Sequence, residues 1–224
     1  MKNIIKVLFL LVLLIAMMEG QAQESKQQFF VFLNPNADAA ILDEIHVQKI
    51  LRDHLNNMDS LHQAGYLLAS GPFREKGGIL VLLADSLGEA HRMLASDPAI
   101  IAERFIPEVF PFIIEHGNLC EVGSKYTMGE YQFLRLSPFP YDMKELVKPG
   151  ELEAEHLAYI DSKPDSISVL LQGSLGADFG KVIIYNTGDR QRAENVFQRD
   201  PYVRYMKYAY EIRTLWVARE SLCE

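Results

Sequence analysis

The sequence has few of the residues that mark the commonest specialised classes of protein. It has two cysteines, Cys120 and Cys223, in neither a C-x-x-C nor any other metal-binding spacing. Lysine and arginine number 22 against 30 aspartates and glutamates, and no basic cluster occurs, which argues against a nucleic-acid partner. The chain also lacks low-complexity segments and a G-x-S-x-G motif, so it indicates neither a disordered protein nor a serine hydrolase of that type.

The one long hydrophobic run lies at the N-terminus. Lys2 and Lys6 precede the apolar residues 7–18, and residues 20–22 (GQA) supply small side chains for cleavage. This order is typical of a secretory signal peptide, and the run is shorter than the roughly 20 residues of a membrane span. We therefore expect residues 1–22 to be removed, leaving a periplasmic or secreted protein with no stable membrane span. The alternative is an uncleaved N-terminal anchor.

The rest of the chain contains one pattern twice. The two copies align at a shift of 102 residues, which becomes 103 after a one-residue insertion near Arg190. A period of this length indicates a domain duplication and not a solenoid. The matching pairs are Phe29/Tyr131, His54/His156, Gly71/Gly173, Gly78/Gly180, Ala90/Ala193, Asp97/Asp200, Pro98/Pro201 and Cys120/Cys223.

Each copy predicts the element order β-α-β-β-α-β. Apolar runs bounded by turn residues predict strands, while apolar residues at helical spacing predict helices. In the first copy we expect strands at 29–33, 66–69, 79–84 and 109–115, and helices at 43–64 and 86–95. Ser86 and Glu89 predict a capping box. In the second copy we expect strands at 131–136, 168–171, 181–185 and 208–217, and helices at 151–161 and 189–198. The apolar face of the first helix comprises Ile50, Leu51, Leu55, Met58 and Leu61.

We predict an α+β fold of two tandem ferredoxin-like units packed as an intramolecular pseudo-dimer, of the dimeric α/β-barrel type. A four-stranded sheet with both helices on one face leaves its other face uncovered, and in a tandem chain the second copy can cover it. The expected units are residues 27–117 and 130–220, joined by the polar linker 118–129. Whether the monomer pairs further does not follow from the sequence.

Two histidines and two aspartates occupy matching positions in the copies. His54 and His156 lie on the apolar faces of their helices. Asp97 and Asp200 each precede proline, as a helix N-cap followed by proline at the first helical position does. An aspartate that orients an imidazole makes a general acid or base that works near neutral pH. The alternatives are a histidine satisfied in the core and an aspartate that is a cap alone.

The ordered motifs resemble the YCII-related family. The first copy contributes RDHL (52–55), GPF (71–73) and SDP (96–98), and the second contributes AEHLAYI (154–160) and RDP (199–201). The resemblance implies a ferredoxin-like fold, pairing into dimers and a catalytic His/Asp dyad, which here means His54 with Asp97 and His156 with Asp200. It also implies lyase or isomerase chemistry, since the family includes a dehydrochlorinase acting on chlorinated hydroxyquinols and its fold resembles that of muconolactone isomerase.

The second copy departs from the family pattern at one place. It has Gly-Ser-Leu at 173–175 where the first copy has Gly-Pro-Phe. We expect a small-molecule ligand between the sheet and loop 71–78, with Gly71, Pro72 and Phe73 as the ligand-binding residues.

The sequence predicts neither a cofactor nor a metal site. His46, His54 and His62 are spaced by eight residues and do not converge on one helix face. We therefore expect an exported enzyme of lyase or isomerase type with an unspecified substrate. The alternative is a non-catalytic small-ligand-binding or structural module of the same fold. Cys120 and Cys223 each follow the last strand of a copy, so they either form a disulfide near the pseudo-two-fold axis or remain free thiols.

Overall fold

The computed structural model describes residues 26–139, 149–162, 167–177 and 179–223. The expected signal peptide, residues 1–22, lies outside the described residues. Within the described ranges, no helix is long and apolar enough to cross a membrane.

Both halves of the chain show the predicted order of strands and helices, and a further short helix begins at the Asp-Pro step of each half. The first half comprises β1 (Gln27–Pro35), α2 (Glu44–Gln63), β2 (Leu67–Pro72), β3 (Gly78–Ala84), α3 (Leu87–Ala95), α4 (Pro98–Ile101) and β4 (Phe105–Leu119). The second comprises β5 (Met128–Pro138), α5 (Pro149–Asp161), β6 (Val169–Ser174), β7 (Lys181–Tyr185), α6 (Arg190–Phe197), α7 (Pro201–Arg204) and β8 (Tyr208–Ala218). The 3-10 turn Arg219–Ser221 and the short strand β9 (Leu222–Cys223) end the described chain.

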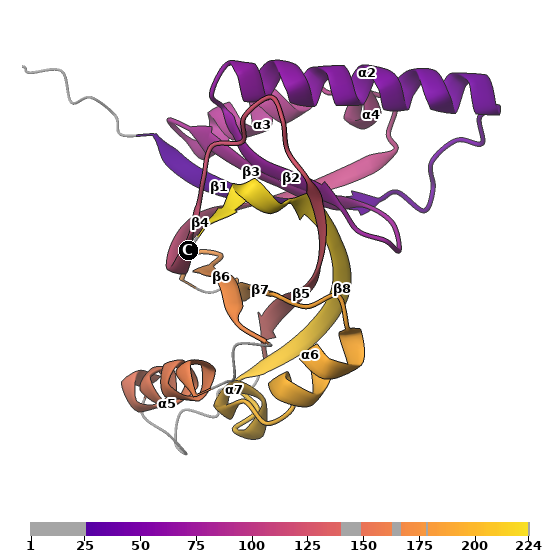
Figure 1. Ribbon diagram of the computed structural model, residues 1–224. Coiled ribbons are helices and arrows are strands. Elements are labelled where there is room, and N and C mark those ends of the chain that lie inside the picture. Colours follow the sequence, from indigo (N-terminus) through magenta and orange to yellow (C-terminus); the bar gives the residue numbers. More distant parts are fainter. Residues whose placement is uncertain (1–25, 140–148, 163–166, 178, 224) are drawn as a thin grey trace, which may run out of the picture.

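The strands form one continuous antiparallel sheet in the order β2-β3-β1-β4-β6-β7-β5-β8, with β9 on the end of β4. The sheet curves until its two outermost strands meet (Figure 1). Phe73 forms a β-bridge with Leu215, and the Arg74 amide donates to the Thr214 carbonyl at 2.9 Å. The two halves are therefore joined at two seams, β4 with β6 and the end of β2 with β8.

Glycine permits the close approach at the second seam. A Cβ atom on Gly71 would lie 2.1 Å from the Trp216 carbonyl oxygen and 3.1 Å from a Leu215 methyl. Real Cβ atoms are not found so close to a backbone oxygen. The first glycine of the GPF motif thus has a packing role in closing the sheet.

Side chains from the strands of both halves point into the lumen of the curved sheet and pack together there. In β1, Phe30 and Phe32 point into the lumen, while Phe29, Val31 and Leu33 pack against the helices of the first half. A strand buried on both faces needs an uninterrupted apolar run, which is the pattern of residues 29–33. The lumen core consists of Phe30, Phe32, Ala69, Phe73, Ile79, Val81, Phe112, Tyr131, Phe133, Leu171, Leu175, Val182, Ile184, Leu215 and Val217.

The helices cover the outside of the sheet on opposite sides, α2, α3 and α4 on one and α5, α6 and α7 on the other (Figure 1). The predicted apolar face of α2 is wrong at Leu51 and Leu55, which are 47% and 57% exposed. Met58 is the buried residue of α2, and His54 and Leu61 are partly buried. The inward face of α2 is therefore the stripe through His54, Met58 and Leu61, and Leu51 and Leu55 lie to one side of it.

The predicted capping box of α3 is present in part. Ser86 accepts a hydrogen bond from the Glu89 amide, as expected. The Glu89 carboxylate, however, accepts from the amide of Asp85, one residue before the cap. The cap of α3 therefore consists of two hydrogen bonds, one to Ser86 and one from Asp85, and not of a reciprocal Ser86–Glu89 pair.

A disulfide and strand pairing join the C-terminal strand β9 to the first half. Cys120 and Cys223 are joined by a disulfide with an S–S distance of 1.99 Å. Beside it, β9 pairs with the end of β4, and the Cys120 amide donates to the Ser221 carbonyl at 3.0 Å. Of the two alternatives left by the sequence, the structure has the disulfide.

Candidate active site

Each Asp-Pro step begins a short helix. Asp97 has an extended backbone, with φ −74° and ψ 124°, and Pro98 is the first residue of α4. One carboxylate oxygen, Oδ1, accepts the Ala99 amide at 2.8 Å. Asp200 does the same for α7, accepting the Tyr202 amide at 2.8 Å. The sequence prediction of two helix caps is confirmed.

The second oxygen of Asp97 contacts a histidine. Asp97 Oδ2 lies 2.8 Å from Nδ1 of His54 on α2. Asn57, one turn further along α2, donates to the same oxygen at 3.1 Å. Because an ionised carboxylate only accepts hydrogen bonds, Nδ1 of His54 carries the hydrogen. The aspartate thus uses one oxygen to cap α4 and the other to hold the imidazole.

The surroundings of Asp97 keep its carboxyl ionised. The residue is fully buried, and burial alone raises the pKa of its carboxyl. The hydrogen bond and positive charge of His54 and the hydrogen bonds from Ala99 and Asn57 outweigh that effect, and they hold the pKa of Asp97 below its ordinary value of 3.8.

His54 keeps one ring nitrogen open. Its side chain is 13% exposed, and the Phe105 ring packs near it at a centroid distance of 6.1 Å. Within the described chain, Nε2 has no hydrogen-bond partner, whereas Nδ1 is held by Asp97. An imidazole oriented through one nitrogen and open at the other is the arrangement of a general acid or base.

His156 and Asp200 are also in contact, but both ring nitrogens of His156 have hydrogen-bond partners. His156 and Asp200 are both fully buried, and Nδ1 of His156 lies 2.9 Å from each carboxylate oxygen. Nε2 lies 2.9 Å from Oε1 of Gln172 on β6. The ring also stacks on Tyr202, with centroids 3.8 Å apart and an interplanar angle of 18°.

The partners of His156 determine which of its nitrogens carry hydrogen. Gln172 donates through its amide nitrogen to Glu115 at 3.0 Å, which orients its carbonyl oxygen toward His156. That oxygen can only accept, and so can the Asp200 carboxylate, so both ring nitrogens of His156 are donors. The hydrogen bonds therefore describe an imidazolium that has no lone pair with which to take up a proton.

A polar network extends from His156 to the first half of the chain. Lys181 contacts both oxygens of Glu115, at 2.7 and 2.6 Å, and approaches Glu153 at 3.3 Å. Tyr202 donates to the other oxygen of Glu153. Burial and this hydrogen bond raise the pKa of the Tyr202 hydroxyl far above its ordinary value. Glu115 lies on β4, so the network crosses the seam between β4 and β6.

Sequence reasoning missed the residues that distinguish the two pairs. Asn57 lies one turn after His54 and Glu153 one turn before His156, so helical spacing could have found them. Lys181, which begins the apolar strand KVIIY, was a visible anomaly. Gln172 and Glu115 come together because β4 pairs with β6, and no local pattern signals that pairing.

The predicted ligand-binding residues do not lie with the dyads. Phe73 is 5% exposed and packs in the lumen, 5.2 Å from the Phe133 ring centroid. Gly71 lies at the seam with β8, and Pro72 between them is exposed. Their assignment as ligand-binding residues stays a prediction.

Comparison with known proteins gives a family for the first half and a fold for the whole. Residues 28–113 match the model of the YCII-related domain, so the first half is a YCII-related domain. Among proteins with curated descriptions, none matches this chain.

Solved structures share the fold at low sequence identity. A mutant chlorite dismutase from Candidatus Nitrospira defluvii, in complex with cyanide, is 12% identical with a TM-score of 0.56, covering 86% of this chain and 91% of its own. A provisionally assigned chlorite dismutase is 13% identical with a TM-score of 0.50, covering 87% and 94%. A protein from Thermus thermophilus described as heme-binding is 12% identical with a TM-score of 0.48, covering 87% and 90%. The first two matches show that the chain has a mixed α/β antiparallel sheet of the dimeric α/β-barrel type.

The described lumen is lined with aromatic and aliphatic side chains. Among the described residues, no group of three or more histidines, cysteines, aspartates or glutamates is placed to hold a metal ion.

Proposed function

We propose that the first half of this protein is a general acid–base site for a small molecule, with His54 as the proton carrier and Asp97 as the residue that orients it. The observation that carries the proposal is the difference between the two nitrogens of His54. Nδ1 is held at 2.8 Å by Asp97, and Nε2 is free within the described chain on a partly exposed ring.

The proposed chemistry is proton transfer of lyase or isomerase type. Nε2 of His54 takes a proton from a carbon of the substrate, and Asp97 stabilises the resulting imidazolium through Nδ1. The same nitrogen then returns the proton to another atom in an isomerisation, or to the departing group or water in an elimination. Asn57 restrains the carboxylate, so the ring keeps one orientation throughout.

We further propose that the second half is a YCII-like copy whose pair no longer performs acid–base chemistry. His156 matches His54 and Asp200 matches Asp97 in the repeat, and the His/Asp contact is retained. Gln172 occupies Nε2, however, and the ring is fully buried. In this proposal His156 and Asp200 hold α5 and α7 against the sheet, and the two units form a pseudo-dimer within one chain.

The location that we propose is the periplasm or the exterior of the cell. The disulfide between Cys120 and Cys223 supports this proposal, because structural disulfides persist in oxidising compartments. We propose that residues 1–22 direct export. We also propose that the exported protein is a monomer, because the lumen-facing side of each half of the sheet packs against the other half.

A non-catalytic module is the second candidate function. The observation in its favour is the filled lumen, in which the GPF residues serve the closure of the sheet and not an open cleft. In this alternative Asp97 is a cap and His54 a core residue.

An exchange assay distinguishes the two candidates. The protein is incubated in deuterated water with small unsaturated lactones and chlorinated hydroxyquinols, and deuterium uptake and chloride release are measured. We expect His54→Gln to abolish turnover and His156→Gln, measured where it remains folded, to retain it. Turnover that survives His54→Gln would contradict the proposed role of His54.

A further inference from the structure

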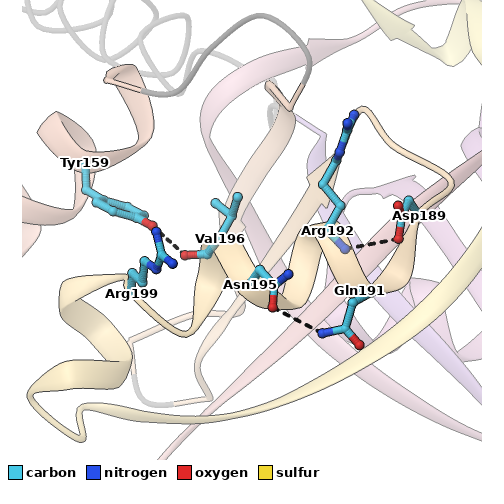
Figure 2. Close-up of a pocket in the computed structure, with 7 residues that line it drawn as sticks. All are labelled: Tyr159, Asp189, Gln191, Arg192, Asn195, Val196 and Arg199. Atoms are coloured by element: carbon cyan, nitrogen blue, oxygen red, sulfur yellow. Dashed lines mark hydrogen bonds between the residues drawn. The ribbon is translucent and has the colours of Figure 1, made fainter.

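A groove between α5 and α6 belongs to neither His/Asp pair (Figure 2). Its volume is about 480 Å³, within the range of pockets that hold small molecules. Tyr159 of α5 faces α6 across it, and Arg192 and Arg199 lie toward its two ends (Figure 2). Asp189, Gln191 and Asn195 also line it.

The two arginines carry uncompensated charge. Neither Arg192 nor Arg199 forms an ion pair with any described residue, although the whole chain has a net charge of −8. Asp189 is the acidic residue of the lining, and its carboxylate accepts the Arg192 backbone amide at 3.0 Å as the N-cap of α6. The groove is thus a positive site on an acidic protein.

The walls of the groove are fixed by hydrogen bonds. The Tyr159 hydroxyl donates to the Val196 carbonyl and holds α5 against α6. On α6, Gln191 donates to Asn195 at 3.1 Å, which joins consecutive turns of the helix. A ligand would therefore meet a preformed surface with the Tyr159 ring as its flat side, and little ordering would be needed on binding.

The first half does not repeat this pair of arginines, although its Arg92 matches Asn195 of the groove lining. At the matching positions of the repeat, Glu89 stands for Arg192, Ser96 for Arg199 and Asn57 for Tyr159. The shared fold therefore does not require arginines at these positions. The second half, in which both ring nitrogens of His156 are hydrogen-bonded, has a different polar surface between α5 and α6.

We propose that this groove binds a small dianion, whose carboxylate or phosphoryl groups pair with Arg192 and Arg199 and whose body lies against Tyr159. Planar guanidinium groups suit such ligands because they form paired, charge-assisted hydrogen bonds with carboxylate and phosphate. The second half would then recognise an acidic metabolite independently of the acid–base site of the first half.

The test is a titration of the purified protein, observed by NMR at the arginine Nε–H groups. Inorganic phosphate and succinate are added separately at constant ionic strength, so that the two arms separate a phosphoryl ligand from a dicarboxylate. We expect saturable shifts at Arg192 and Arg199 in at least one arm. Removal of one charge-assisted contact, by Arg192→Gln or Arg199→Gln, should weaken binding about tenfold.

Arg204→Gln is the matched control, because Arg204 is an exposed arginine of α7 outside the groove. It removes the same charge and should leave binding unchanged. The proposal is overturned if neither anion gives saturable shifts at Arg192 and Arg199. Equal weakening by all three substitutions would also overturn it, since that result indicates diffuse attraction. The titration of the wild-type protein tests the proposal by itself, even if one of the substitutions prevents folding.

Discussion

Nε2 of His156 lies 2.9 Å from Oε1 of Gln172, a contact that has no counterpart in the first His/Asp pair. The position equivalent to Gln172 in the first half is Ser70, which forms no side-chain hydrogen bond among the described residues. Nε2 of His54 consequently has no hydrogen-bond partner among the described residues, whereas Nε2 of His156 is bonded to Gln172. One polar side chain on a neighbouring strand thus determines which histidine has an open ring nitrogen.

Gln172→Leu should destabilise the protein. The substitution leaves a buried donor on His156 and removes a donor from Glu115, and an unsatisfied buried polar group costs about 1 to 3 kcal/mol. Urea unfolding measures the loss. Ser70→Ala, the matching change in the first half, should alter stability by no more than about 0.5 kcal/mol. Similar effects of the two substitutions would show that the Gln172 network is not a structural feature of the second half.

Asp97 should make stability depend on acid pH. The pKa of its carboxyl is lower in the folded protein than the ordinary 3.8, so the folded state holds the proton less tightly than the unfolded state. The stabilisation is complete above the unfolded pKa and is lost as pH falls through the folded pKa. Urea midpoints measured at about pH 5 and about pH 3 should fall further for the wild type than for Asp97→Asn. Parallel losses would contradict this linkage.

Asp97→Asn is suited to this comparison because asparagine is itself a good N-cap. The variant therefore keeps α4 capped while removing the charge beside His54. Asp97→Ala, which removes the cap as well, should cost about 1 kcal/mol more than Asp97→Asn at neutral pH. Equal stability of the two variants would indicate that the Oδ1 contact to Ala99 contributes little.

The disulfide should stabilise the chain strongly, since it closes a sequence separation of 103 residues. The entropy of so large a loop sets an upper limit of about 4 to 5 kcal/mol. We expect Cys120→Ser and chemical reduction of the wild type to lower the free energy of unfolding equally, with no further effect of reductant on the variant. Mass mapping that finds both thiols free in protein from its native compartment would contradict the link.

Gly71→Ala should open the seam between β2 and β8. The new methyl group would meet the Trp216 carbonyl oxygen at 2.1 Å, and overpacking of this kind costs about 1 to 3 kcal/mol. Gly88→Ala in α3 is the control, because the nearest atom to its Cβ would be 3.6 Å away and alanine favours a helix. Thermal unfolding should show a loss for Gly71→Ala and no loss for Gly88→Ala.

The sequence predicted most of the fold because its signals were local. The strand at 181–185 was predicted residue for residue, and the helix at 43–64 included one capping residue at each end. The burial of α2 was wrong at Leu51 and Leu55, since α2 has apolar residues on more than one side and periodicity alone does not show which side packs against the sheet.

The site was predicted less completely for a different reason. The repeat aligned His54 with His156 and Asp97 with Asp200, but it could not show the neighbours that the two rings acquire from other strands. Gln172 and Glu115 meet across strands β4 and β6 and are 57 residues apart in sequence. Such contacts depend on sheet order, which capping motifs and periodicity do not encode.

The most direct test of the account is a long-range proton–nitrogen NMR spectrum of the histidine rings at about pH 8, where an ordinary imidazole is neutral. We predict that His54 carries hydrogen on Nδ1 and a lone pair on Nε2, and that Asp97→Asn, which can itself donate to Nδ1, moves that hydrogen to Nε2. A wild-type His54 with its hydrogen on Nε2, or a tautomer unchanged by Asp97→Asn, would contradict the assignment of His54 and Asp97 as an acid–base pair.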